Sequence, residues 1–166
     1  MLVVLGLGSN LGDSRRIILE AAKALEEILR DCKMAKLYET EPLYVKDQAN
    51  FINTALSGFF DDPQAPEISS RKLLSLIHNI ETRFGRDRSR ERRWGERNLD
   101  IDILLFGDFI IKESDLVIPH PLLRERRFAL EPLLELLPEA REPESGLSYR
   151  EICYALPEQR VKKIMN

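Results

Sequence analysis

Two aspartates, Asp100 and Asp102, stand inside the otherwise apolar segment LDIDILLF over residues 99–106. Side chains two residues apart on a β-strand point to the same face, so these two carboxylates would lie side by side. Neighbouring carboxylates repel each other, and removing them from water is costly without a cation. Oxygen ligands on a rigid strand suit Mg²⁺, which completes its shell with water and substrate phosphates. The pair therefore predicts either a magnesium site or a structural salt-bridge cluster with nearby arginines.

Positive charge is concentrated directly before this strand. Residues 83–97 contain seven arginines and three acidic residues, although the whole chain has a net charge of −3. Guanidinium groups bind phosphate oxygens through paired hydrogen bonds, and a local basic segment on an acidic chain favours a small anionic ligand over a long polyanion. The segment contains glycines and no apolar periodicity, so it predicts a loop that either binds phosphate or is simply solvated. Trp94, the only tryptophan, either packs on the core or closes over a planar ligand.

Several other kinds of protein are not supported by the sequence. The segment GLGSNLG does not match the GxxxxGK[ST] pattern of a P-loop, and Cys32 and Cys153 lack the spacing of a zinc or redox site. The apolar runs are too short to span a bilayer, and the start MLVVLGLGSN lacks the basic region of a signal peptide. We therefore expect a cytoplasmic protein of one domain over residues 1–166, with no membrane, nucleic-acid or obligatory protein partner.

Hydrophobic patterning predicts the elements that position the charged residues. Strands are expected around residues 2–8, 33–40, 51–60 and 99–106, and Gly107-Asp108 would turn the last of these into a hairpin with 109–111. One helix would begin at Asp13 or Ser14, a second at Ser69 or Ser70, and a third would lie within 119–139. The order strand–helix–strand–strand–helix–strand is the ferredoxin-like pattern. The predicted fold is therefore α+β, a mainly antiparallel sheet with helices packed on one face and the other face open to a ligand.

Six segments, in order over nearly the whole chain, carry a more specific signal: LGLGSNLGD (5–13), YETEPLY (38–44), FINTAL (51–56), NIETRFGRDR (79–88), RWGERNLDIDILLFG (93–107) and PHPLLRERRFALEPLLEL (119–136). Together they resemble the 6-hydroxymethyl-7,8-dihydropterin pyrophosphokinases of folate biosynthesis. The resemblance implies the ferredoxin-like architecture. It also implies transfer of an intact diphosphate from Mg-ATP to the hydroxymethyl group of the pterin, with release of AMP.

The resemblance further implies a set of site residues. Asp100 and Asp102 would be the metal ligands, serving two Mg²⁺ ions that bridge the triphosphate, and the catalytic set would be these two with Arg86 and Arg97. ATP contacts fall on His78, Glu81, Arg88, Arg93, Trp94, Ile103, His120 and Arg126. The pterin site falls on Thr40, Leu43, Phe51, Asn53 and Phe128, where two aromatic rings would enclose the bicyclic ring and the Asn53 amide would pair with its edge.

Two other functions share parts of this pattern. RNA-recognition domains have the same order of elements, but they present a basic sheet with stacking aromatics, whereas here Asp100 and Asp102 would lie on the ligand face. An enzyme-like scaffold without activity would be expected to have lost the carboxylates or the arginines, and both are present. Formation of AMP from ATP separates the enzyme from both alternatives.

Overall fold

The computed structural model describes residues 1–43, 47–86 and 95–164 of the 166-residue chain. Its elements follow one another as β1 (Leu2–Ser9), α1 (Ser14–Glu26), β2 (Arg30–Met34), β3 (Tyr38–Thr40), β4 (Phe51–Phe59), α2 (Pro66–Arg83), β5 (Asp100–Phe106), β6 (Ile111–Lys112), β7 (Val117–Ile118), the 3₁₀ helix η1 (Leu123–Glu125), α3 (Arg127–Leu136), α4 (Tyr149–Ala155) and β8 (Val161–Lys163).

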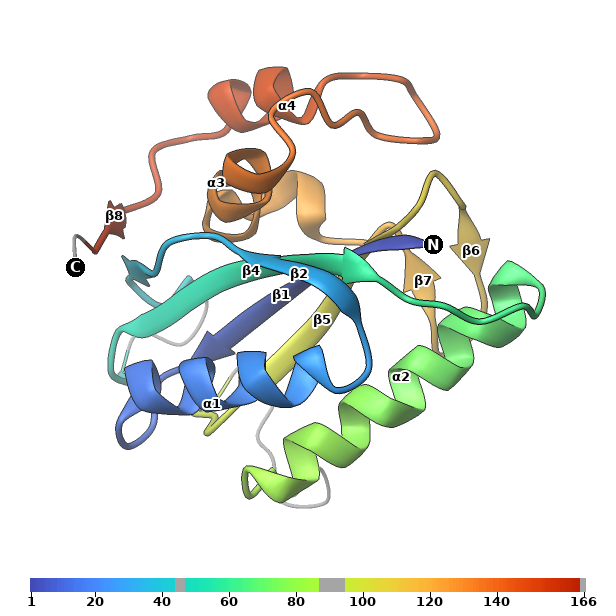
Figure 1. The fold of residues 1–166 in the computed structure, drawn as a ribbon. Coiled ribbons are helices and arrows are strands. Elements are labelled where there is room, and N and C mark those ends of the chain that lie inside the picture. Colours follow the sequence, from blue (N-terminus) through green and yellow to red (C-terminus); the bar gives the residue numbers. More distant parts are fainter. Residues whose placement is uncertain (44–46, 87–94, 165–166) are drawn as a thin grey trace.

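Six of the described strands form one antiparallel sheet in the order β5–β1–β4–β3–β8, with β2 also paired to β4. The strand expected over 33–40 is divided, because β2 pairs with one end of β4 and β3 with the other. The central position of β1 places the sequence-distant strands β4 and β5 on its two sides (Figure 1). The predicted α+β, ferredoxin-like class is confirmed.

Helices α1 and α2 cover one face of the sheet, below it in Figure 1. Their apolar stripes bury Ile18, Leu25, Leu73 and Ile77 against alternate residues of β1 and β5 such as Leu5 and Ile101. Helix α1 begins as expected, since the Asp13 carboxylate accepts a hydrogen bond from the Arg16 backbone N–H at 3.1 Å. Helix α2 does not begin at Ser69 or Ser70, because Pro66 occupies its first turn, where its fixed φ and missing N–H favour helix initiation.

Helices α3 and α4 pack on the opposite face, above the sheet in Figure 1. Leu130 and Leu133 of α3 and Tyr149 of α4 form a second core with Val4 and Ala55 of the sheet. The expectation of helices on one face therefore holds for α1 and α2 only. The other face is covered over part of its area, since α3 carries its own apolar stripe, and a ligand must enter beside α3.

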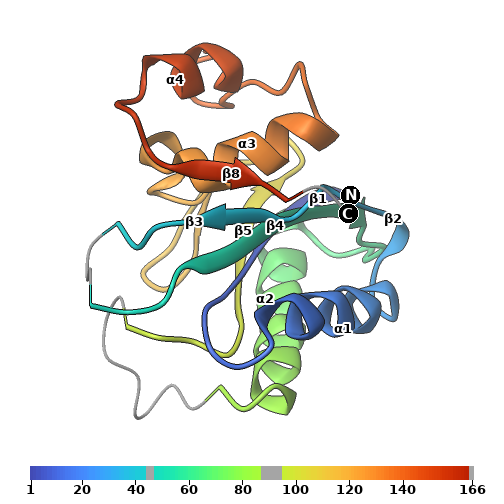
Figure 2. The ribbon, with the colours of Figure 1, turned by 90° about the vertical axis from the view of Figure 1, so that its left-hand side faces the viewer.

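Two local expectations differ from the structure. Residues 109–111 do not pair with β5; instead β6 pairs with β7, and the Glu113 N–H donates to the Leu116 carbonyl at 3.0 Å. The weakly patterned C-terminal segment adds α4 and then β8, which extends the sheet beside β3 (Figure 2). None of the helices in the described ranges has both the length and the apolar character needed to cross a membrane.

Candidate active site

The floor of the site is a row of residues across three neighbouring strands. Asp100 of β5, Gly8 of β1 and Asn53 of β4 are in register, and Asp102 is in register with Gly6 in the next row. Residues two apart on one strand project from the same face, and so do directly paired residues of neighbouring strands. Asp100 and Asp102 therefore lie on one face of the sheet, as predicted, together with Asn53. With no side chain on Gly6 or Gly8, the space between the carboxylates and Asn53 stays open.

An open cavity lies above this floor, between the sheet and the N-terminal end of α3. It brings together ten of the predicted site residues: Thr40, Leu43, Phe51, Asn53, Arg97, Asp100, Asp102, His120, Arg126 and Phe128. The expected pterin residues and the expected metal pair therefore line one continuous space. Backbone and apolar side chains of β1 and β5, such as Leu104, complete the wall.

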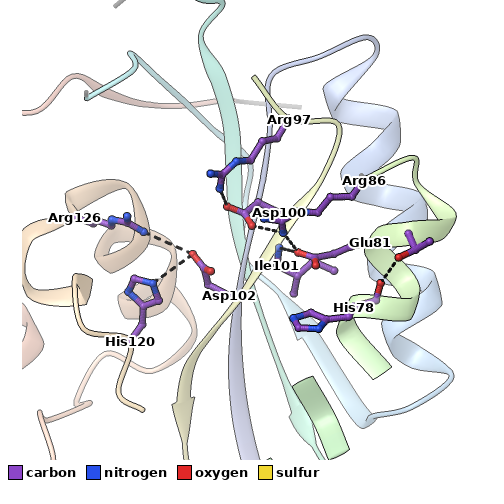
Figure 3. Close-up of polar contacts among 10 residues, drawn as sticks. His78, Glu81, Arg86, Arg97, Asp100, Ile101, Asp102, His120 and Arg126 are labelled. Atoms are coloured by element: carbon purple, nitrogen blue, oxygen red, sulfur yellow. Dashed lines mark hydrogen bonds and ion pairs between the residues drawn. The ribbon is translucent and has the colours of Figure 1, made fainter. Parts of the chain in front are cut away.

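Asp100 is held by two arginines. The guanidinium groups of Arg86 and Arg97 both donate to its carboxylate, one to each oxygen (Figure 3). Burial alone would raise the pKa of Asp100, but the positive charges of Arg97 and Arg86 together lower it below its ordinary value. Asp100 thus stays ionised, and the salt-bridge alternative considered for the aspartates applies to this residue.

Asp102 has a different environment. Its Oδ2 lies 3.6 Å from Nη1 of Arg126 and 3.8 Å from Nε2 of His120, on the α3 side of the cavity (Figure 3). Burial, together with the negative charge of Asp100, raises the pKa of Asp102 to about 7. The side chain keeps 36% of its surface exposed, so solvent moderates this shift. The cavity therefore contains a carboxylate whose negative charge is only partly balanced.

His120 is fixed in a neutral form. Burial and the adjacent charge of Arg126 lower its pKa to about 4. Its Nδ1 accepts a hydrogen bond from the Leu122 N–H at 3.1 Å, which leaves the ring proton on Nε2, the atom directed at Asp102. The backbone N–H of His120 donates to the Leu104 carbonyl at 3.1 Å, so the backbone of this residue is anchored to β5.

Four predicted residues lie behind the cavity wall instead of lining it. Glu81 of α2 is fully buried, accepts from the Ile101 N–H at 2.8 Å, and pairs with Arg86. Arg86 thereby joins α2 to Asp100. Ile103 packs in the core beneath α1 and α2, and His78 stands on α2, where its carbonyl accepts from the Thr82 hydroxyl at 2.8 Å. Arg88, Arg93 and Trp94 lie outside the described residues.

Sequence reasoning missed the residues that shape the cavity without carrying charge. Besides the two glycines, Asn10 links three segments: its Nδ2 donates to Gln48 Oε1 and the Ala49 carbonyl, and its Oδ1 accepts from the Arg97 N–H at 2.8 Å. The alternation of glycine with leucine in GLGSN was a usable signal, because glycine inside a strand marks close approach of other atoms. The partners of Asn10 could not be read from the sequence.

The aspartate pair also bears on metal binding. Across the described ranges, no cluster of three or more His, Cys, Asp or Glu side chains could hold a metal ion by itself. Asp100 and Asp102 supply oxygen ligands on a rigid strand, and a cation there would offset both the burial and the mutual repulsion that raise the pKa of Asp102. This donor set fits Mg²⁺ that receives its remaining ligands from phosphate oxygens and water.

Comparison with known proteins gives consistent matches. The family model for 7,8-dihydro-6-hydroxymethylpterin-pyrophosphokinase matches residues 4–138. The protein named 2-amino-4-hydroxy-6-hydroxymethyldihydropteridine pyrophosphokinase from Aquifex aeolicus is 39% identical over 142 residues, 85% of this chain and 83% of that protein. The Bacillus subtilis protein of the same name is 37% identical over 134 residues, 80% of this chain and 75% of that protein. The fold also matches the solved Plasmodium falciparum HPPK-DHPS (20% identity, TM-score 0.65), covering 92% of this chain but only 43% of that longer chain.

Proposed function

This chain belongs to the 7,8-dihydro-6-hydroxymethylpterin-pyrophosphokinase family and is a pyrophosphokinase of folate synthesis; we propose that its cavity binds ATP and the dihydropterin together, with the reacting groups beside Asp100 and Asp102. One observation carries the proposal. A single cavity combines a slot of aromatic and amide side chains with a carboxylate pair surrounded by Arg97, His120 and Arg126. The first set suits a flat heterocycle and the second a metal-bound polyphosphate. We further propose that the enzyme is cytoplasmic and that residues 1–166 form one domain.

The pterin end of the cavity is built by β3, β4 and α3. Phe51 and Phe128 come from different walls, so a planar ring can lie between them. Asn53 Nδ2 donates to the Thr40 hydroxyl at 2.7 Å, an arrangement that fixes the amide orientation. With its donor directed at Thr40, the Asn53 carbonyl oxygen can accept from an N–H group on the pterin edge. This position is buried, so an unmatched ligand would leave a polar group unpaired and bind weakly.

Asp100 and Asp102 would hold Mg²⁺, two ions in the proposed complex, with the triphosphate supplying further oxygens. When bound, the metal supplies positive charge to the phosphate groups and brings them next to the carboxylates. Arg97 donates to Asp100 in the unliganded protein, and it lines the cavity, so it is placed to contact a phosphate oxygen as well. Arg86 instead orients Asp100 from behind.

The proposed reaction is an in-line displacement. The pterin hydroxyl oxygen forms a bond to the β-phosphorus while the bond from that phosphorus to the α–β bridging oxygen breaks, and AMP leaves with the electron pair. The hydroxyl proton passes to Asp102 or to solvent. Arg97 and the neutral His120 donate toward the oxygens on which charge increases, and fixed donors of this kind stabilise the transition state without reorganisation. Positioning of the two substrates in one cavity supplies the rest.

The direct test is incubation with 6-hydroxymethyl-7,8-dihydropterin, ATP and Mg²⁺, followed by chromatography of the nucleotide products. AMP and a pterin diphosphate should appear in equal amounts, and EDTA should stop their formation. ADP in place of AMP would contradict diphosphate transfer. Turnover that survives EDTA would contradict the metal role of Asp100 and Asp102. Salt-sensitive RNA binding without any nucleotide product would favour the RNA-recognition alternative.

A further inference from the structure

The segment after α4 contacts both walls of the cavity, although it lies beyond residues 4–138, which match the family. Figure 2 shows β8 running between β3 and α3. Val161 of β8 is in register with Thr40 of β3, and the Ile164 N–H donates to the Leu37 carbonyl at 2.8 Å. The segment is therefore fixed to the wall of the cavity that carries Thr40.

Gln159, just before β8, is hydrogen-bonded to the other wall. Its Oε1 accepts from the Arg127 backbone N–H at 2.9 Å, and its Nε2 donates to the Glu125 carbonyl at 2.8 Å. The two bonds lie on either side of Arg126, so one side-chain amide holds the peptide groups before and after that residue. A carboxamide suits this place because its nitrogen donates while its oxygen accepts.

This contact replaces a missing helix cap. Arg126 occupies the N-cap position of α3, and its own side chain makes no capping hydrogen bond. The first N–H groups of a helix have no partner within the helix and need one from elsewhere. Gln159 supplies it for Arg127 from 32 residues further along the chain. A residue outside the helix therefore holds the first turn of α3 in place.

The residue held in this way is directed into the cavity. Nη1 of Arg126 lies 3.6 Å from Asp102, and the Arg126 guanidinium carbon lies 5.6 Å from the centre of the Phe128 ring. Both Arg126 and Phe128 line the cavity. A small rotation of the backbone at the N-cap would move the arginine at the phosphate end and the aromatic ring at the pterin end together.

A second set of contacts joins β8 to α3. The Glu135 carboxylate near the end of α3 accepts from the Tyr38 hydroxyl at 2.7 Å and pairs with Lys163 of β8 at 2.9 Å. Helix α3 is thus attached to β3 and β8 near its C-terminal end through Glu135 and to the same segment at its N-terminal end through Gln159.

We propose that Gln159 is a positioning residue that aligns Arg126 and Phe128 for binding of ATP and the pterin. The proposal rests on the proposed function in one respect, namely that these two residues contact the substrates. The capping contact itself can be tested without any substrate.

The test compares Gln159→Met, which keeps the length of the side chain but removes both hydrogen bonds, with Glu158→Met at the adjacent exposed position as matched control. In the unliganded Gln159→Met protein, hydrogen exchange of the Arg127 amide should become at least tenfold faster, while amides in the centre of β1 stay unchanged. The KM for both substrates should rise about tenfold, with kcat changed less than threefold. Glu158→Met should leave all of these values within twofold of the wild type.

A third variant, Gln159→Glu, keeps the acceptor for Arg127 and loses the donor to Glu125; it should retain the slow exchange of Arg127 and most of the substrate affinity. Faster Arg127 exchange with unchanged KM in Gln159→Met would overturn the positioning role and leave the cap as a structural contact. Unchanged Arg127 exchange would overturn the cap as well. Failure of the proposed function is a separate result, because it would appear as absence of AMP in the wild-type protein.

Discussion

Gly8 and Asn53 face each other across β1 and β4, and a Cβ atom on Gly8 would lie 2.9 Å from Oδ1 of Asn53. Few real Cβ atoms approach another heavy atom so closely, so the Asn53 amide can occupy its position only because residue 8 is glycine. The geometry joins a backbone feature of the central strand to the orientation of a cavity-lining amide, which in turn donates to Thr40.

Gly8→Ala should therefore weaken pterin binding more than it weakens the fold. The added methyl group displaces the Asn53 amide, and we expect the KM for the pterin to rise at least tenfold while the KM for ATP changes less than threefold. Gly6→Ala is the matched comparison, since its Cβ would meet the Leu104 side chain, at 3.2 Å, and not Asn53. Equal effects of the two substitutions in steady-state kinetics would count against the role given to Asn53.

Asp100 and Asp102 should respond differently to neutralisation. Asp102→Asn removes the charge proposed to bind Mg²⁺ but relieves repulsion with Asp100, so activity should fall at least 100-fold with no loss of thermal stability. Asp100→Asn removes the same kind of charge and also leaves Arg86 and Arg97 without their shared carboxylate. It should lose activity and about 1–3 kcal/mol of unfolding free energy. Product assays measure the activity, and urea unfolding measures the unfolding free energy. Near-normal turnover in either variant would contradict the proposal that these aspartates bind the metal.

The pH dependence of stability contains two opposing contributions. The folded-state pKa of Asp102 is about 7, above its ordinary 3.8, so its contribution to unfolding free energy is present at low pH and is lost as the pH rises to 7. The folded-state pKa of His120 is about 4, below its ordinary 6.5, so its contribution is lost as the pH falls from 6.5 to 4. In the Asp102→Asn variant only the contribution of His120 remains. Urea unfolding should show this variant gaining stability relative to the wild type between pH 4 and 7; a constant difference would contradict the raised pKa of Asp102.

His120 should remain neutral throughout the range in which the enzyme is assayed. Nitrogen-15 NMR of the imidazole ring should show a single neutral form with the proton on Nε2 above pH 5. The chain has only two histidines, so His78→Gln assigns the signal directly. A His120 signal that titrates near pH 6.5 would show that the ring is more solvated than its surroundings indicate.

Glu81 should prove to be mainly structural. Its carboxylate is fully buried and joins the Ile101 N–H to Arg86, so Glu81→Gln leaves a buried guanidinium poorly matched. We expect a loss of about 3–5 kcal/mol in unfolding free energy, by analogy with other broken buried pairs. The KM for ATP should change much less than it does in Arg97→Met. A large, selective increase in the ATP KM without destabilisation would instead support direct nucleotide contact by Glu81.

The sequence was informative where chemistry and periodicity coincide in a short segment. The alternation in LDIDILLF was enough to place Asp100 and Asp102 on one face, and the stripe of α2 was enough to bury Leu73 and Ile77. The predicted start of α2 was wrong, because Ser69 matched the preference for a capping residue while the helix actually begins at Pro66. The pairing of β6 with β7 was missed because very short strands have no periodicity to detect.

Contacts between distant segments were not predictable in the same way. The link from Asn10 to Gln48 and Arg97 and the link from Gln159 to Arg127 join polar residues that carry no local pattern. Each depends on the three-dimensional arrangement of strands that are far apart in the chain. The resemblance to the family named substrate-facing residues, but it contained no information about which buried residues hold them in place.

The pairing of β8 with β3 has a consequence for joining this chain to other domains. Suppose that a second domain replaced everything after Pro138, where the family match ends. Every proposed substrate contact would be retained, but β3 would lose its partner β8, and an unpaired strand edge favours intermolecular association. Backbone pairing along this edge continues to Ile164, whose N–H bonds to the Leu37 carbonyl. A linker to a second enzyme should therefore begin after that residue, with the shortest tether that leaves β8 in its place.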